Sequence, residues 1–192
     1  MTLVTTKQWT SSTWTFERHD KVPHERLLVK VIAHDIQLGS AARWIRNWLA
    51  GRRQRVCINQ TFSSWTPVTS GVPKGSVLGP LLFLIYINDL VYGIVSKINI
   101  QICWWHKICH SARNPEEVLE LQEDLNRLVD WANTWQMNFN IDKCAVMYIG
   151  DNNIQYNYTM ANQQLIATEE QRDVGITITR DLKWQKKKRK KL

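Results

Sequence analysis

Residues 70–90 constrain the fold more than any other part of this sequence. They begin with a loop of small residues and prolines, Ser-Gly-Val-Pro-Lys-Gly-Ser-Val-Leu-Gly-Pro, and continue into a mostly apolar stretch. Glycine allows backbone conformations and close approaches that other residues resist. The segment therefore predicts a tight loop followed by a helix over 77–90 that buries its apolar side chains.

Apolar spacing predicts helices on both sides of this segment. Residues 23–33 and 41–50 have helical periodicity. The side chains expected to face inward are Leu27, Leu28, Val31, Ile32, Trp44, Ile45, Trp48 and Leu49. A third helix is expected from Asn114, because Asn is a good cap and Pro115 suits the first helical position. Apolar residues at spacings of three and four extend that helix to Trp135.

Alternating apolar and polar residues predict strands between the helices. Residues 52–59 and 62–68 are expected to pair as a hairpin, and 138–149 and 174–178 are expected to form further strands. Helices and hairpins interleave without a regular strand-helix repeat. This arrangement indicates the α+β class.

The charge balance makes a polyanion a plausible partner. The chain has 192 residues and a formal net charge of +8. A basic excess of this kind is typical of proteins that bind nucleic acid. Six of the positive charges lie in residues 186–191, so a soluble protein with a basic tail is the competing interpretation.

Cysteine usage and hydropathy indicate an intracellular protein. Cys57, Cys103, Cys109 and Cys144 are scattered, so no disulfide framework is expected. The most apolar stretch, residues 80–87, is too short to span a bilayer, and no signal peptide is recognisable. We expect no membrane association, and the choice between nucleus and cytoplasm stays open.

The loop and helix at 70–90 resemble motif B of reverse transcriptases from non-LTR, jockey-like retrotransposons. The resemblance rests on the whole run from Ser-Gly-Val-Pro-Lys-Gly-Ser to Tyr-Ile-Asn-Asp-Leu. It implies that template and nucleotide approach the loop at Gly71, Pro73, Lys74, Gly75 and Ser76. Lys74 stands where the family usually has Gln.

Further segments extend the resemblance over residues 21–184. Residues 20–24, 135–144 and 174–176 resemble the end of motif A, motif D and motif E. By this resemblance Lys143 lies near nucleotide phosphates, although a solvated hairpin lysine is the alternative. The implied fold is a partial right-hand polymerase palm, an antiparallel sheet backed by helices, with an RNA template and a DNA primer as partners. The expected division is 1–19, 20–184 and a basic tail at 185–192.

The family's metal-binding aspartates are missing from this sequence. These polymerases hold two magnesium ions with one aspartate of motif A and a pair in motif C, and the ions activate the attacking oxygen. The corresponding positions here are Trp14, Trp104 and Trp105. An indole has only an N–H to donate and cannot bind a metal. We therefore expect no metal cofactor and a catalytically dead chain.

A frameshift accounts for these tryptophans. A family-like motif A peptide, Val-Asp-Val-Val-Tyr-Leu-Asp-Phe, can be encoded so that reading one base later gives every residue from Trp9 to Phe16. A similar shift through motif C gives two stop codons at positions 104 and 105. Each of these stop codons differs from a tryptophan codon by a single base. Segments out of frame were never selected to fit a core, so residues 1–15 and 186–192 are expected to pack loosely.

Three other interpretations stay open. The chain could be a non-catalytic nucleic-acid-binding fragment that uses its basic surface, or it could never accumulate as a stable protein. Cys103, His106, Cys109 and His110 could suggest zinc, but structural zinc normally takes ligands from two separated arms. His24 and His34 have no partner pattern and are expected at the surface.

Overall fold

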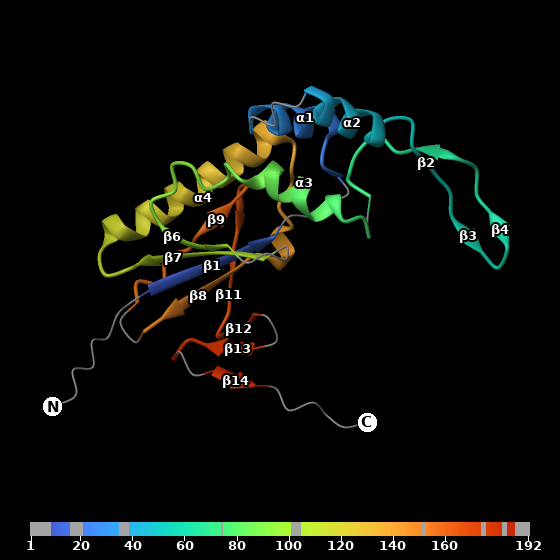
Figure 1. Ribbon diagram of the computed structural model, residues 1–192. Helices are drawn as coiled ribbons and strands as arrows, with labels where there is room; N and C mark the ends of the chain where they lie inside the picture. The colour runs from blue at the N-terminus through green and yellow to red at the C-terminus, as the bar shows by residue number, and fades with distance from the viewer. Residues whose placement is uncertain are drawn as a thin grey trace. The chain divides into compact units, whose positions relative to one another are not determined.

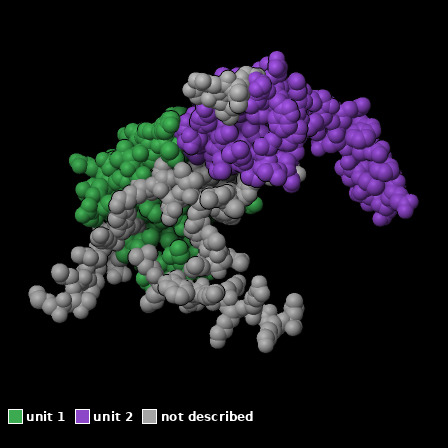
Figure 2. All heavy atoms as spheres, viewed as in Figure 1, with its two compact units in different colours: residues 1–16, 91–132, 139–192 green, residues 17–90, 133–138 purple. Residues whose placement is uncertain are grey.

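The computed structural model in Figure 1 describes residues 9–15, 21–34, 39–73, 75–100, 105–150, 153–173, 176–181 and 184–186. Its contacts divide the chain into two compact units, coloured in Figure 2. Unit 1 comprises residues 1–16, 91–132 and 139–192, and unit 2 comprises 17–90 and 133–138. Each unit has buried apolar side chains of its own.

Unit 1 is built on a five-stranded sheet in the order β11-β8-β1-β7-β6. The strands are β1 (Trp9–Thr15), β6 (Lys97–Ile100), β7 (Trp105–Ser111), β8 (Ala145–Ile149) and β11 (Ile166–Ala167). All neighbours pair antiparallel except β8 and β11, which are parallel. The sheet and the helices together confirm the α+β prediction.

Helix α4 (Pro115–Trp135) runs along this sheet, and its part up to residue 132 belongs to unit 1 (Figure 1). As predicted, the Asn114 side chain caps it by accepting a hydrogen bond from the Glu117 backbone N–H at 2.8 Å. Its apolar stripe is buried, and Glu120 pairs with His110 of β7 at 3.1 Å. The amphipathic pattern therefore places this helix on the sheet.

A buried carboxylate fastens α4 to the start of β6. Asp124 has no exposed surface and accepts hydrogen bonds from the backbone N–H groups of Val95 and Ser96, at 3.2 and 2.7 Å, and from the Ser96 hydroxyl. Arg127 adds an ion pair at 2.7 Å. A buried charge is tolerated when it is paired and hydrogen-bonded in this way.

The remaining elements of unit 1 are short. They are η2 (Ile141–Lys143), β9 (Thr159–Met160), β10 (Gln163–Gln164), β12 (Glu170–Asp173), β13 (Ile176–Thr179) and β14 (Trp184–Lys186). The expected strand over 138–149 is wrong in its first half, where η2 replaces it. The Asn140 carbonyl oxygen accepts a hydrogen bond from the Lys143 backbone N–H at 3.0 Å. This bond closes a local 3₁₀ turn in place of an extended strand.

Unit 2 contains helices α1 (His24–Ala33), α2 (Gly39–Leu49) and α3 (Leu78–Ile87), as the sequence predicts. Helix α1 contacts both α2 and α3. The core of the unit is formed by Leu27, Leu28, Val31, Ile45, Leu49, Leu82, Phe83 and Tyr86. Two side chains predicted to face inward do not, because Ile32 is 57% and Trp44 53% exposed. No helix within the described residues is long and apolar enough to cross a membrane.

A partly buried ion pair lies within unit 2. Lys30 of α1 forms a salt bridge with Asp89, and its ammonium lies 3.6 Å from the centre of the Trp135 ring. Burial lowers the pKa of Lys30, and the hydrogen bond and charge of Asp89 act against that shift. The Tyr86 hydroxyl donates to the Trp135 carbonyl oxygen, and burial raises the pKa of Tyr86.

The expectation of a loosely packed segment up to residue 15 is wrong for residues 10–12 of β1, whereas the side chains of Trp9 and Trp14 lie outside the described residues. This strand pairs with β7 on one side and β8 on the other, in the middle of the sheet. Thr10, Ser11 and Ser12 are buried. Backbone hydrogen bonds hold a strand in a sheet whatever its side chains are. Residues 1–8 and 187–192 lie outside the described residues.

The buried hydroxyls of β1 differ in their contacts. Ser11 Oγ accepts from Cys109 Sγ at 3.6 Å, whereas Ser12 Oγ has no hydrogen-bond partner among the described residues. An unsatisfied buried hydroxyl costs about 1–3 kcal/mol. We predict that Ser12→Ala raises the free energy of unfolding by about 1 kcal/mol, and the melting temperature by roughly 2–4 °C.

Ser11→Ala is the matched control in the same strand, and it should be neutral or destabilising because it removes a satisfied hydroxyl. Urea titration of both variants measures the difference. Equal destabilisation by the two substitutions would contradict the assignment of Ser12 as an unsatisfied group.

Candidate active site

The positions of two predicted motif residues lie one register step apart on neighbouring strands of unit 1. In the β1–β7 register, Trp14 stands opposite His106 and Thr15 opposite Trp105. Trp14 and Trp105 are therefore one step apart, where the end of β1 meets the start of β7. Trp104, the third position, lies outside the described residues.

These two strands offer no ligand suited to magnesium. Strand β1 reads Trp-Thr-Ser-Ser-Thr-Trp-Thr and β7 reads Trp-His-Lys-Ile-Cys-His-Ser, without a carboxylate in either. Magnesium is a hard cation that takes oxygen ligands, chiefly carboxylates, in near-octahedral geometry. The described residues also contain no cluster of three or more His, Cys, Asp or Glu side chains placed to hold a metal. The side-chain types of β1 and β7 therefore do not fit the magnesium ions of the family.

Lys143 lies in η2, which contacts β1 within unit 1. Its side chain is exposed. The structure therefore places this cation on the element next to the strand that carries Trp14.

The motif B loop lies in unit 2 and is ordered by its own backbone and by Ser76. Gly71 and Gly75 have φ angles of 80° and 76°, a conformation that favours glycine. The Ser76 hydroxyl donates to the Pro73 carbonyl at 2.7 Å and accepts from the Gly79 N–H at 3.0 Å. Lys74 lies outside the described residues. The predicted loop is thus present, and it leads directly into α3.

The Gly71 carbonyl oxygen lies within hydrogen-bond distance of two side chains, those of His24 and Arg52. His24 Nε2 and Arg52 Nη2 each lie 2.9 Å from that oxygen, and the Gly71 N–H donates to the Val22 carbonyl at 2.8 Å. His24 Nε2 also lies 3.1 Å from Arg52 Nη2. One ring nitrogen cannot donate and accept at once, so His24 either donates to Gly71 or accepts from Arg52.

Sequence reasoning missed this clamp. His24 was expected at the surface with no partner, and that expectation is wrong because its side chain is half-buried against Gly71. Arg52 is also partly buried, and desolvation lowers its pKa. The two contacts with Gly71 span 47 and 19 residues of sequence. No local spacing reveals partners so far apart. His34 is exposed, as expected.

Two of the four candidate zinc ligands, Cys109 and His110, make other contacts. Cys109 Sγ contacts Ser11, and His110 pairs with Glu120. Cys109 and His110 are also successive residues of β7, and successive side chains of a strand point to opposite faces. Cys103 lies outside the described residues, and so does the His106 side chain. Cys57, Cys109 and Cys144 form no disulfide in the part of the chain that the structure describes.

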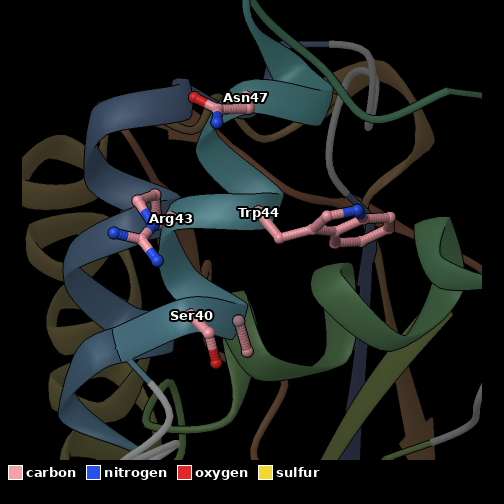
Figure 3. Close-up of a pocket in the computed structure, with 5 residues that line it drawn as sticks. Ser40, Arg43, Trp44 and Asn47 are labelled. Atoms are coloured by element: carbon pink, nitrogen blue, oxygen red, sulfur yellow. The ribbon is translucent and has the colours of Figure 1, made fainter.

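An open hollow lies along α2 in unit 2 (Figure 3). Its lining residues are Ser40, Ala41, Arg43, Trp44 and Asn47. All of them belong to one helix, whereas ligand pockets normally enclose most of a ligand's surface. The hollow therefore presents a basic and aromatic surface rather than an enclosed binding site.

A family model and individual relatives identify the same family for this chain. Residues 5–188 match the family described as Reverse transcriptase (RNA-dependent DNA polymerase). The RNA-directed DNA polymerase from mobile element jockey of Drosophila melanogaster is 26% identical over 147 residues, which cover 72% of this chain and 16% of the relative. The jockey polymerase of Drosophila funebris is 27% identical over 176 residues, covering 87% of this chain and 19% of the relative.

Solved structures agree with the palm-like fold. Telomerase from Candida tropicalis, in complex with a fragment of telomeric RNA, superposes with a TM-score of 0.64 at 8% identity, covering 100% of this chain and 32% of that chain. The apo telomerase gives 0.64 at 9% identity, with coverages of 96% and 33%. At such low identity this likeness concerns the fold alone.

The chain thus spans less than a fifth of these two jockey relatives. Its motif B loop, its α+β architecture and its match over residues 5–188 point the same way. This chain belongs to the reverse transcriptase (RNA-dependent DNA polymerase) family, and within it to the polymerases of non-LTR retrotransposons.

Proposed function

We propose that this chain is a reverse transcriptase palm that has lost nucleotidyl transfer and uses no metal cofactor. The observation that carries the proposal is that β1 and β7, the paired strands that hold positions 14 and 105, contain no carboxylate. Two divalent ions close together repel each other, and only a cluster of carboxylates offsets that repulsion. Asp89, one of the remaining carboxylates, forms an ion pair with Lys30.

The polar core of β1 supports the frameshift as the cause of the loss. Residues 11 and 12 lie in the middle strand of the sheet, where buried side chains are usually apolar. Here they are Ser11 and Ser12, both buried, and Ser12 Oγ has no partner among the described residues. Buried hydroxyls in the middle strand of a sheet fit a backbone inherited from an ancestor and side chains that were not selected for it.

We predict that the purified chain adds no nucleotide to a primer annealed to an RNA template in the presence of Mg²⁺. Replacing Trp104 and Trp105 with aspartate should leave the chain inactive, because position 14 would still lack a carboxylate. The measurement is extension of a labelled primer, compared with a reaction without protein.

An active jockey-type polymerase domain under the same conditions serves as the positive control. Extension by the unmodified chain above the no-protein background would overturn the proposed loss of activity. Sequencing the genomic DNA across codons 8–20 and 98–110 tests the cause separately. Codons in frame with those of intact copies would rule out the frameshift.

A second candidate function is non-catalytic binding of nucleic acid inside the cell. The observation that favours it is a one-sided charge distribution in unit 2. Between Asp35 and Asp89 the sequence contains no Asp or Glu, while it contains six basic residues: Arg43, Arg46, Arg52, Arg53, Arg55 and Lys74. Such a stretch attracts the phosphate backbone of RNA or DNA.

Binding through phosphates predicts a steep dependence on salt. Each phosphate contact to a single strand contributes about −0.7 to the slope of log K against log salt concentration. We predict a slope of roughly −2 to −4 for a labelled single-stranded RNA, measured by fluorescence anisotropy between 50 and 200 mM KCl. A slope near zero would contradict electrostatic binding, whatever the affinity.

A further inference from the structure

Unit 2 carries an exposed arm formed by residues 52–68 (Figure 1). Strands β2 (Arg53–Gln54) and β5 (Thr66–Pro67) pair at its base, and β3 (Cys57–Ile58) and β4 (Thr61–Phe62) pair at its tip. Between them the Ser63 N–H donates to the Val56 carbonyl at 2.9 Å. The arm is therefore one continuous two-stranded hairpin.

Both ends of the arm have defined geometry. At the tip, Asn59 and Gln60 have φ angles of 48° and 65°, the positive values of a tight hairpin turn. At the base, Arg52 donates from Nε to the Leu49 carbonyl at 3.0 Å and from Nη2 to the Gly71 carbonyl. The arm is thus anchored to α2 and to the motif B loop within the same unit.

Arginines and aromatic rings gather on the arm. The Arg55 guanidinium lies 3.8 Å from the centre of the Phe62 ring and 4.6 Å from that of Trp65. Arg53 lies 5.9 Å from the Trp65 ring. Phe62 is 53% and Trp65 49% exposed, so each ring keeps about half of its surface open to solvent.

Nothing in the core of unit 2 requires these rings. A hairpin of two strands is marginally stable in water, and apolar rings at its surface gain little by folding. An aromatic ring has two faces, and an arginine over one of them leaves the other for a second flat partner. Nucleic-acid bases stack on aromatic rings in this manner, and arginines beside them neutralise phosphates.

We infer that the arm binds single-stranded nucleic acid by stacking bases on Phe62 and Trp65 while Arg53 and Arg55 contact phosphates. The acid-free stretch from residue 36 to 88 gives the charge complementarity for this partner. A single strand is specified because bases inside a duplex are already stacked and closed to the rings. The inference rests on the proposed nucleic-acid partner and goes beyond it by locating the contact outside the motif B loop.

The first test removes the rings and keeps the charge. With the full chain and fluorescein-labelled oligo(U) and oligo(dT), the variant Phe62→Leu/Trp65→Leu should weaken binding at least about tenfold, since two base–ring stacks are lost and each is worth about fivefold or more. Its salt slope should stay unchanged, because no cation is lost. Weakening with oligo(U) but not with oligo(dT) would make RNA the partner, and equal weakening would indicate any single strand.

The second test removes charge and keeps the rings. The variant Arg53→Gln/Arg55→Gln should reduce the magnitude of the salt slope by about 1.4, because each lost phosphate contact to a single strand removes about 0.7. The two variants thus give different signatures, a loss of affinity at constant slope and a loss of slope.

Matched controls come from elsewhere in the chain. Trp44→Leu removes another half-exposed tryptophan of unit 2, which stacks on Trp48 at 5.9 Å. Arg113→Gln/Arg180→Gln removes the same charge from arginines that already pair with Glu117 and Glu169. Both should retain affinity within about twofold, and the second should retain the slope within the contribution of one phosphate contact. A loss with Trp44→Leu equal to that with Phe62→Leu/Trp65→Leu would overturn the assignment to the arm.

Photocrosslinking of 4-thiouridine RNA to the unmodified chain does not depend on any variant folding. Fragmentation of the crosslinked tryptic peptide 56–74 should place the crosslinks at or next to Phe62 or Trp65, and crosslinks confined to its motif B residues 70–74 would refute the inference. Crosslinks confined to other peptides would refute the inference, and so would a ring variant that binds RNA normally but loses self-association in sedimentation. Primer extension by the chain would contradict the proposed loss of activity and leave this inference standing, so the two can fail separately.

Discussion

Unit 1 depends on the backbone pairing of β1 with β7 and β8. Without β1 the sheet would split, because β8 and β11 would be separated from β7 and β6. Thr10, Ser11 and Ser12 add little apolar burial at this central position. The N–H and C=O groups of the strand must nevertheless be satisfied, and the two neighbouring strands satisfy them. A backbone ladder can therefore tolerate side chains that a core would not favour, at the cost of an unsatisfied hydroxyl on Ser12.

Backbone pairing can preserve the sheet, but it does not by itself preserve a metal site. Pairing of β1 with β7 places positions 14 and 105 one register step apart on neighbouring strands, through backbone geometry alone. Whether an ion can bind at that point depends on the side chains, and an indole supplies neither charge nor a lone pair. The fold and the catalytic function of a polymerase palm thus have different requirements, and we propose that this chain meets only the first.

Much of the fold follows from sequence periodicity, and the rest follows from contacts that local sequence does not encode. The stripe of Val118, Leu121, Leu125 and Leu128 predicts α4, and the Asn114 cap predicts its first residue. The turn at η2 was missed because a hydrogen bond to Asn140 competes with an alternating pattern. The clamp of His24 and Arg52 on Gly71, and the ion pair of Lys30 with Asp89, join helices and loops far apart in sequence. The motif B loop itself was predictable because glycine and proline restrict the backbone locally.

Binding of Mn²⁺, which can replace Mg²⁺ at carboxylate sites, tests most directly whether the metal centre is absent. The chain would be titrated with Mn²⁺ in the presence of primer, RNA template and a nonhydrolysable nucleotide, and followed by electron paramagnetic resonance. The same mixture without the chain gives the signal of Mn²⁺ on the nucleic acid and nucleotide. The account predicts no further binding and no spin coupling between neighbouring ions. A spin-coupled Mn²⁺ pair that appears only with the chain would contradict it.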